Sequence, residues 1–287
     1  MTRIFASVLL ILTLPVPARG TLVVIVPSAD GLVVAADSRT SLNGANCDNP
    51  NKITELSRPK RTVVAVTGDV AFIKPPDAQE QDVCGYLKSA PRLLDIASVV
   101  KSYLERKHAD PAKLRIEDLG AECVGAVQRF RENEPLALEP YVGREIFSVV
   151  IASYDAHLKT ATVLNFAVRI DGATHRVEAG RFTRIAMTPQ SRRGVWSYGE
   201  SDYLNRSVFA GAGRKYLTDA TLNFMLVDKP VAEARLDEAV AAAGNVIEAA
   251  SRTTQLTPSL SGIGGPVEMV LLGRKSRPEP VEWKGNR

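Results

Sequence analysis

The chain has 287 residues, of which 45% are hydrophobic, so it is long enough to bury a sizeable core in one large domain. The formal net charge is only +4 and the basic residues are dispersed, which argues against a nucleic-acid-binding surface. The sequence contains no P-loop, no dinucleotide-binding fingerprint and no internal repeat, and we expect neither a metal nor an organic cofactor.

Residues 1–20 have the pattern of a secretory signal peptide. Arg3 supplies a positive charge, Ile4 to Leu14 form an apolar run, and Pro15 to Gly20 are mostly small residues. The apolar run is about half of the roughly 20 residues that a membrane-spanning helix needs. We therefore expect export to the periplasm or the extracellular space, and no membrane attachment once the leader has been removed.

The sequence after the leader is rich in short apolar runs that predict strands. Thr21–Pro27 and Gly31–Ser38 are separated by turn-forming residues and predict a hairpin. Lys52–Leu56 and Thr62–Thr67 predict a second pair of strands. Residues 69–90 contain two prolines among mixed polar residues and predict a loop.

Two predicted helices and three predicted strands occupy the middle of the chain. Leu93–Tyr103 and Ile116–Phe130 have apolar residues at helical spacing. The strands are predicted at Ile146–Ser153, Thr160–Arg169 and Arg176–Met187.

The remaining sequence predicts two more helices, a last strand and a tail. One helix is predicted from near Ser201, another over Leu236–Ala250, and the strand over Pro266–Leu272. We expect a leader at 1–20, one domain at 21–273 and a mobile polar tail at 274–287. The order of elements predicts an α+β fold with two antiparallel sheets packed together and helix pairs outside, a four-layer αββα sandwich.

Thr21 directly follows the leader, and a threonine at a new N-terminus has its own chemistry. The α-amine of such a residue can act as the base that activates its own hydroxyl. A nearby lysine cation lowers the pKa of that amine, and a carboxylate keeps the lysine charged. Asp37 ends the second predicted strand and Lys52 begins the third, so the sequence supplies both groups.

Five motifs around these residues resemble the proteasome β-subunit family of N-terminal nucleophile hydrolases. They are Gly20-Thr21 followed by LVVIV, GLVVAADSRTSLNG from residue 31, Asn51-Lys52-Ile53, AVTGD from residue 65, and GIGGPVEMVLL from residue 262. The resemblance implies the four-layer fold named above, a threonine-type peptidase or amide hydrolase, and a peptide or small-amide substrate. Because members of that family assemble into rings, it also implies a homo-oligomer.

The resemblance also implies a role for each matching residue. Thr21 would be the nucleophile, Asp37 and Lys52 would set the charge around it, and Gly68 would donate its N–H to the oxyanion. Gly20 would be the leaving side of the maturation bond. From the residues alone, Asp37 and Lys52 are also consistent with a surface ion pair, and Gly68 with a glycine that ends a strand.

Several alternatives remain open at this stage. Signal peptidase could cut after Gly20, or after Ala18, which would leave two residues for Thr21 to remove itself. The substrate could be a small amide, as in an acylase of the same fold. A third hypothesis is a non-catalytic scaffold or binding protein in which Thr21 stays internal.

The three cysteines are Cys47, Cys84 and Cys123. Cys123 lies on the apolar side of a predicted helix and is expected to be buried. Cys47 and Cys84 both lie in loop-like sequence, so they are a candidate disulfide in an oxidising compartment, although the sequence does not decide whether they pair.

Overall fold

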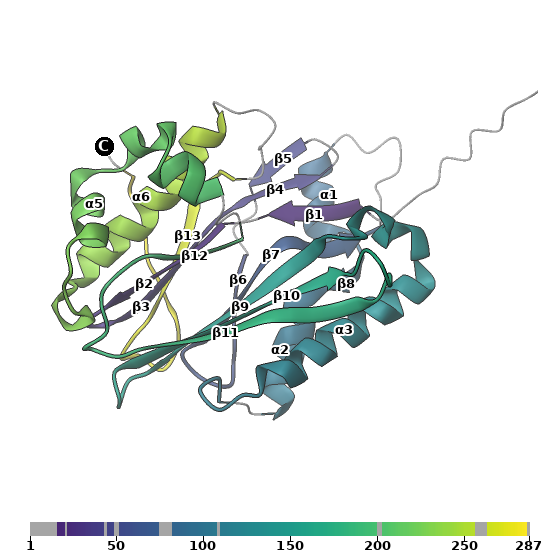
Figure 1. The fold of residues 1–287 in the computed structure, drawn as a ribbon, viewed down its shortest axis with the longest axis horizontal. Coiled ribbons are helices and arrows are strands. Elements are labelled where there is room, and N and C mark those ends of the chain that lie inside the picture. The colour runs from purple at the N-terminus through teal and green to yellow at the C-terminus, as the bar shows by residue number, and fades with distance from the viewer. Residues whose placement is uncertain are drawn as a thin grey trace, which may run out of the picture.

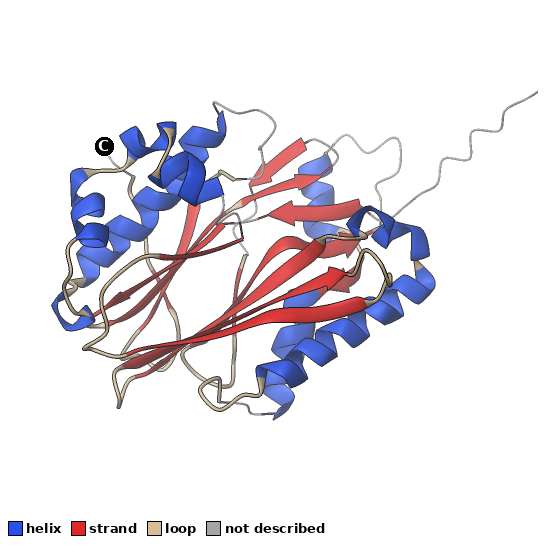
Figure 2. Cartoon of the chain, in the orientation of Figure 1, coloured by secondary structure: helices blue, strands red, loops and turns tan. Residues whose placement is uncertain are grey.

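Two antiparallel sheets form the centre of the molecule, as a computed structural model shows (Figure 1). The structure describes residues 16–20, 22–42, 45–48, 52–74, 82–107, 110–199, 203–255 and 263–285. Figure 2 shows that the helices lie on the outer sides of the strands.

The larger sheet has nine strands among the described residues. In spatial order they are β11 (Val177–Met187), β10 (Thr160–Ile170), β9 (Glu145–Asp155), β7 (Thr62–Ile73), β1 (Val16–Gly20), β4 (Arg39–Leu42) and β5 (Ala45–Asp48), while β6 (Ile53–Glu55) and β8 (Arg92–Asp95) also pair with β7. The long strand β7 thus pairs with four others, and it connects the β9–β11 meander to the strands near the N-terminus.

The smaller sheet has five strands in the part of the chain that the structure describes. Their order is β12 (Trp196–Gly199), β2 (Leu22–Ser28), β3 (Gly31–Asp37), β13 (Val267–Leu272) and β14 (Glu279–Pro280). The register places Val267 of β13 opposite Asp37 at the end of β3. The C-terminal part of the chain therefore lies beside the predicted acidic residue, although the two are far apart in sequence.

The hairpin of β2 and β3 is buried on both faces. Leu22, Val24 and Val26 belong to an apolar cluster with α6 (Leu236–Gln255), and Val23 and Ile25 belong to a cluster between the two sheets. Successive side chains of a strand point to opposite faces, so a strand covered on both sides reads as a continuous apolar run. This explains the sequence LVVIV at this position.

Three helices pack with the nine-stranded sheet. They are α1 (Val83–Ser89), α2 (Ile96–Lys107) and α3 (Ile116–Asn133), and a 3-10 segment follows at Pro135–Tyr141. The apolar face of α3 covers β10 and β11, whereas α2 lies against β7 and α1 against β5. Their buried residues repeat at the three- and four-residue spacing that keeps one helix face towards a sheet.

One long helix, α6, lies along β2 and β3 on the other side of the molecule. Its inner face is rich in alanine, which lets the helix approach the sheet closely. The shorter α5 (Asp219–Leu226) packs on α6. The chain nearby forms a π-helical segment at Leu204–Phe209 and 3-10 segments at Ala212–Tyr216 and Val231–Glu233.

The expected four-layer αββα sandwich flanked by helix pairs is therefore wrong. The structure is an α+β fold of two antiparallel sheets with several helices, in which α1, α2 and α3 contact the larger sheet and α6 lies along the smaller one. Gly211, Gly213 and Pro230 interrupt the segment before α6, and glycine and proline are the residues that most disfavour a helix interior. The helix predicted from near Ser201 is accordingly a series of short helical segments, of which α5 is the longest.

Three local predictions also need correction. The loop expected at residues 69–90 contains the end of β7 and all of α1, where the carboxylate of Asp82 caps the helix by accepting the N–H of Gly85. Leu93, expected in a helix, lies in β8. The tail pairs through β14 with β13, and Trp283 packs on α6 at Gly244.

The end of the expected leader forms a strand. Residues 16–20 are β1, which lies between β7 and β4 and pairs with both. Its register places Gly20 opposite Gly68 of β7.

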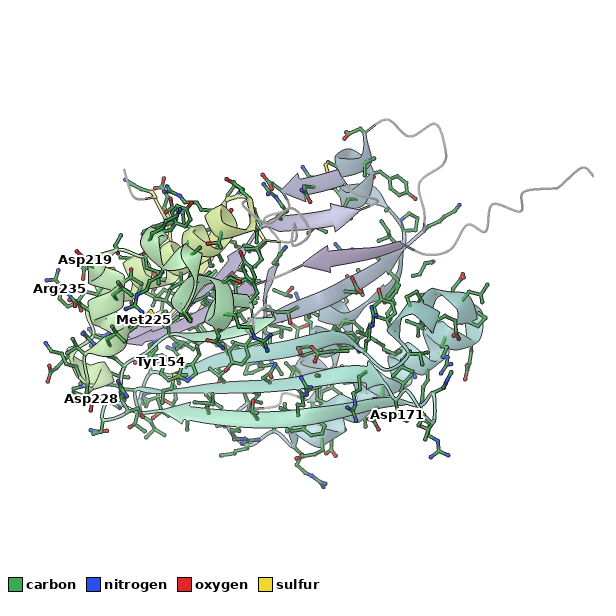
Figure 3. The ribbon with its side chains drawn as sticks, turned by 45° about the horizontal axis from the view of Figure 1, so that its top comes forward. Tyr154, Asp171, Asp219, Met225, Asp228 and Arg235 are labelled. Carbon is green, nitrogen blue, oxygen red and sulfur yellow. A yellow bond between two sulfur atoms is a disulfide. The ribbon has the colours of Figure 1, made fainter. Side chains whose placement is uncertain are left out.

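Exposed charges of both signs are mixed on the surface. Asp171, Asp228 and Arg235 lie at the outside of the molecule (Figure 3), and the last two pair with Arg192 and Asp237. Exposed pairs of this kind contribute little to stability. Within the described part of the chain, none of the helices has both the length and the apolar character needed to cross a membrane.

Candidate functional site

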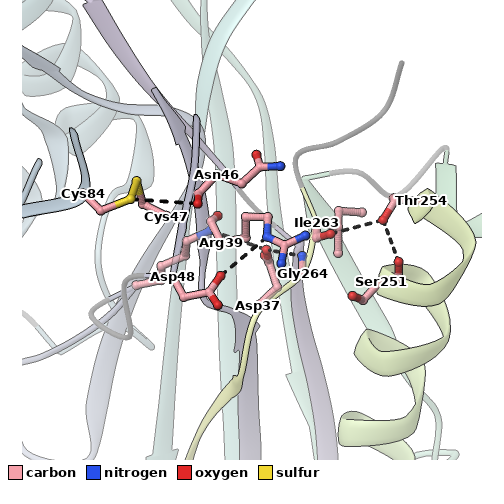
Figure 4. Close-up of polar contacts among 11 residues, drawn as sticks. Asp37, Arg39, Asn46, Cys47, Asp48, Cys84, Ser251, Thr254, Ile263 and Gly264 are labelled. Atoms are coloured by element: carbon pink, nitrogen blue, oxygen red, sulfur yellow. Dashed lines mark hydrogen bonds and ion pairs between the residues drawn. A yellow bond between two sulfur atoms is a disulfide. The ribbon is translucent and has the colours of Figure 1, made fainter. Parts of the chain in front are cut away.

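Asp37 is a fully buried carboxylate at the end of β3. It accepts the backbone N–H of Leu22 at 2.8 Å and that of Gly264 at 3.1 Å, and the ammonium nitrogen of Lys52 lies 3.5 Å from its Oδ2 (Figure 4 shows the Gly264 contact). Burial raises the pKa of Asp37, while the charge of Lys52 and the two N–H donors oppose that rise. The donors compensate a charge that would otherwise be costly to bury.

Lys52 is the residue immediately before β6, and its side chain is 6% exposed. Its ammonium also donates to the carbonyl oxygen of Arg39. Burial lowers the pKa of Lys52, and the neighbouring Asp37 carboxylate works against that change. The structure thus brings the two predicted charged residues together as a buried pair rather than as a surface ion pair.

Gly68 has a backbone conformation that requires glycine. Its φ is +82°, and a Cβ built on it would lie 2.6 Å from the carbonyl oxygen of Ile146. Both features favour a residue without a side chain. Gly68 and Gly20 are register partners, so the residue expected to donate to an oxyanion lies on the strand next to the expected cleavage bond.

Substituting Gly68 by alanine is expected to destabilise the protein by about 2–4 kcal/mol, because the strained φ adds to a clash with backbone atoms that cannot move away. Urea unfolding measures this difference. Gly125→Ala is the matched control, since a Cβ there meets only the end of the Arg129 side chain at 3.4 Å and alanine favours a helix. Equal stability of Gly68→Ala and the wild type would contradict the prediction.

Thr21 lies outside the described residues. Its two sequence neighbours are described: Gly20 pairs with Gly68, and the N–H of Leu22 donates to Asp37. Ser197 of β12 lies opposite Val24 of β2, the strand that begins directly after Thr21.

Glu268 is a polar residue of the site that the sequence analysis missed. It lies on β13, and its Oε2 accepts the N–H of Lys52 at 2.7 Å and that of Ile53 at 3.3 Å. Burial raises the pKa of Glu268 to about 7, although both N–H donors and the charge of Lys52 lower it. A glutamate inside the otherwise apolar strand VEMVLL was the signal that could have identified it.

Glu268→Gln is expected to stabilise the protein above neutral pH. The pKa of Glu268 in the fold, about 7, exceeds its ordinary value of 4.5, so the folded protein holds this proton more tightly than the unfolded chain. The wild type therefore loses stability as the pH rises between these two values, and a glutamine at this position does not. Urea unfolding should show little difference near pH 4 and a clear advantage of the variant near pH 8.5. A difference that is independent of pH would refute this assignment.

The strands beside the charged pair are held by three further contacts (Figure 4). Nε of Arg39 lies 3.5 Å from Oδ1 of Asp48 on β5. The backbone N–H of Arg39 donates to the carbonyl oxygen of Gly264. A disulfide joins Cys47 to Cys84 of α1, with the Cα atoms 5.3 Å apart. The β4–β5 hairpin, which carries the carbonyl group that receives Lys52, is thereby held to α1.

Cys123 is buried in α3, and burial raises the pKa of its thiol to about 12. His157 and His175 are exposed, and His108 lies outside the described residues. Within the ranges that the structure describes, no three or more His, Cys, Asp or Glu side chains are grouped so as to hold a metal ion.

No family model matches the sequence, and no curated protein matches it. Three of the solved structures that match are Anbu proteins. The helical assembly of the Anbu complex from Pseudomonas aeruginosa is 17% identical, with 91% of this chain and 86% of that chain covered and a TM-score of 0.46. Anbu, the ancestral beta-subunit, from Yersinia bercovieri is 12% identical, with 92% and 88% covered and a TM-score of 0.46. Anbu from Hyphomicrobium sp. strain MC1 is 14% identical, with 92% and 89% covered and a TM-score of 0.45.

Identities and TM-scores this low assign neither an activity nor a partner to this chain. The expected membership of an exported family of proteasome β-subunit-like N-terminal nucleophile hydrolases is wrong, because the matching structures are Anbu proteins, a distinct family. Two of the five motifs behind that expectation form a buried hairpin ending in an acid, a local structure that does not by itself define one family.

Proposed function

We propose that this chain is a threonine-type amide hydrolase whose nucleophile is the hydroxyl of Thr21, released as the N-terminal residue when the Gly20–Thr21 bond is cut. The observation that carries the proposal is the buried pair of Asp37 and Lys52, in which the carboxylate also accepts the N–H of Leu22. Asp37, which compensates the charge of Lys52, thus also binds the backbone of Leu22, the residue directly after Thr21. Burying such a pair is costly, so a function is a better reason for it than stability.

The chemistry follows from these groups. The uncharged amine of Thr21 takes the hydroxyl proton, and Oγ attacks the carbon of the substrate amide. The N–H of Gly68 donates to the oxygen as it becomes negative. The C–N bond then breaks, the leaving amine takes the proton from the ammonium of Thr21, and an ester to Oγ remains. Water, deprotonated by the same amine, hydrolyses that ester and restores the hydroxyl.

The charge of Lys52 supports the role of the amine. A cation close to an α-amine favours the uncharged form and so lowers its pKa below the ordinary value of about 7.7 to 8.0. Asp37 is needed to hold that cation in a buried position. Asp37 therefore holds the charged Lys52 in place, and the charge of Lys52 lowers the pKa of the Thr21 amine.

The position of β1 supports an extended peptide as the substrate. Residues 16–20 lie as a strand between β7 and β4 and pair with both. Their departure after cleavage would leave the edges of these two strands available, and such edges bind extended peptides through main-chain hydrogen bonds. The leader itself would be the first peptide bound in this manner, with its last residue beside Gly68.

The same strand favours a second function. Because β1 is paired on both sides, it is also consistent with a permanent strand of a non-catalytic scaffold, in which Thr21 stays internal. The intact mass and the N-terminal sequence of the mature protein separate the two functions. A protein that begins at Thr21 supports the hydrolase, whereas one that retains β1 contradicts it. A peptide library tested beside simple amides then identifies the substrate class.

A further inference from the structure

Glu268 connects the two sheets at the charged pair. Its strand, β13, places it opposite Ala36 of β3, next to the Asp37 position. Its carboxylate crosses to the other sheet, where Oε2 accepts the N–H groups of both Lys52 and Ile53. One side chain thus joins β13, which pairs with the strand that ends in Asp37, to the start of β6, the strand that follows Lys52.

The backbone of Lys52 lies just ahead of the paired part of β6. That strand has three residues and pairs with β7 beginning at Ile53, so Lys52 precedes the first pair in the register. The N–H of Lys52 donates to a carboxylate oxygen from the facing sheet, at 2.7 Å. The Lys52 backbone is thus held by a contact from the facing sheet, outside the register of its own strand.

We propose that Glu268 is a positioning residue for the hydrolase: its side chain sets where the ammonium of Lys52 lies relative to Asp37 by holding the Lys52 backbone. The inference rests on the proposed function, in which Lys52 must lie near the amine of Thr21. The length of the Glu268 side chain, rather than its charge, sets the position of Lys52. A carboxyl oxygen accepts these N–H groups whether or not the carboxyl group carries a proton.

Two conservative variants separate reach from charge. Glu268→Gln retains an acceptor oxygen at the same distance and loses the charge. Glu268→Asp retains the charge but is one methylene shorter, so it loses the contact with Lys52. Glu55→Gln is the matched control, since Glu55 is an exposed carboxylate on β6, close enough to influence Glu268 electrostatically.

Steady-state hydrolysis measures the effect on the reaction. Glu268→Asp is expected to lower kcat about 100-fold with little change in KM, because a displacement of about 1 Å in a catalytic group has an effect of this size. Glu268→Gln is expected to lose about fivefold, the difference between a charged and a neutral acceptor, and Glu55→Gln to match the wild type. Loss of activity in Glu268→Gln equal to that in Glu268→Asp, or full activity in Glu268→Asp, overturns the proposal.

Hydrogen exchange at the Lys52 amide tests the same contact without any activity. This amide should be protected in the wild type and in Glu268→Gln, and should exchange faster in Glu268→Asp, as measured by NMR. Equal protection in all three proteins overturns the positioning role. If the wild type hydrolyses no amide, the proposed function fails, while the exchange rates still decide whether Glu268 holds Lys52.

Discussion

Thr21→Ala is expected to abolish amide hydrolysis and to leave the bond between residues 20 and 21 uncut. The substitution removes the only protein atom that forms a covalent bond to the substrate in the proposed reaction, and loss of such a nucleophile typically lowers kcat by about 10⁴-fold or more. The stability of the variant should be close to that of the wild type. Intact mass, urea unfolding and hydrolysis of the best substrate measure the three effects.

Thr21→Ser is the matched control for this prediction. Serine supplies a hydroxyl and, after cleavage, an α-amine, so this variant should be processed and should retain measurable turnover. Two results would contradict the proposed chemistry: hydrolysis by Thr21→Ala at the wild-type rate, or a wild-type protein that hydrolyses amides while β1 is still attached. Cleavage of the Thr21→Ala variant at the same bond would show that another protease performs the maturation.

Most strands and the long helices could be predicted from the apolar periodicity of the sequence. The apolar pattern is strong in β2, β3, β9 and β10 and in the helices α3 and α6. Each of these elements buries a continuous surface. Short elements such as α1 depend on a single capping side chain, Asp82, and have a weak pattern. The predicted arrangement of the helices was wrong because this arrangement depends on where the segment before α6 is interrupted.

The strand β1 could not be predicted because its residues match the sequence pattern of another kind of segment. Val16–Gly20 read as the end of a signal peptide, and nothing in this short run of mostly small residues specifies a partner strand. Its place between β7 and β4 depends on edges that only the folded sheet provides. A local pattern cannot contain this information, because the partners lie about 20 and 50 residues away.

The candidate site, too, could be predicted only in part from the sequence. Asp37 and Lys52 were proposed from motifs, whereas their 3.5 Å separation depends on how β3 and β6 of different sheets face each other. Glu268 was missed because it acts across the two sheets on a residue 216 positions earlier in the chain. Its only local signal is a glutamate in an apolar strand, which a surface position would explain equally well.

Lys52→Met is expected to destabilise the protein by about 3–5 kcal/mol and to abolish hydrolysis. Methionine fills a similar volume but removes the cation, which leaves the fully buried carboxylate of Asp37 with two backbone donors and no opposite charge from residue 52. Lys229→Met is the matched control: Lys229 is 49% exposed and lies 3.9 Å from Glu233, so its loss should change stability by less than about 1 kcal/mol.

The loss of stability in Lys52→Met should depend on pH. Without the cation, the pKa of Asp37 rises further above its ordinary value of 3.8, so the folded variant binds a proton more tightly than its unfolded chain. The deficit should therefore grow as the pH rises above about 4, and unfolding in urea at about pH 5 and pH 8 measures it. Adding Asp37→Asn to Lys52→Met removes the unpaired charge and should restore most of the stability without restoring hydrolysis. If Lys52→Met were as stable as the control and still active, the buried pair would have no part in the reaction.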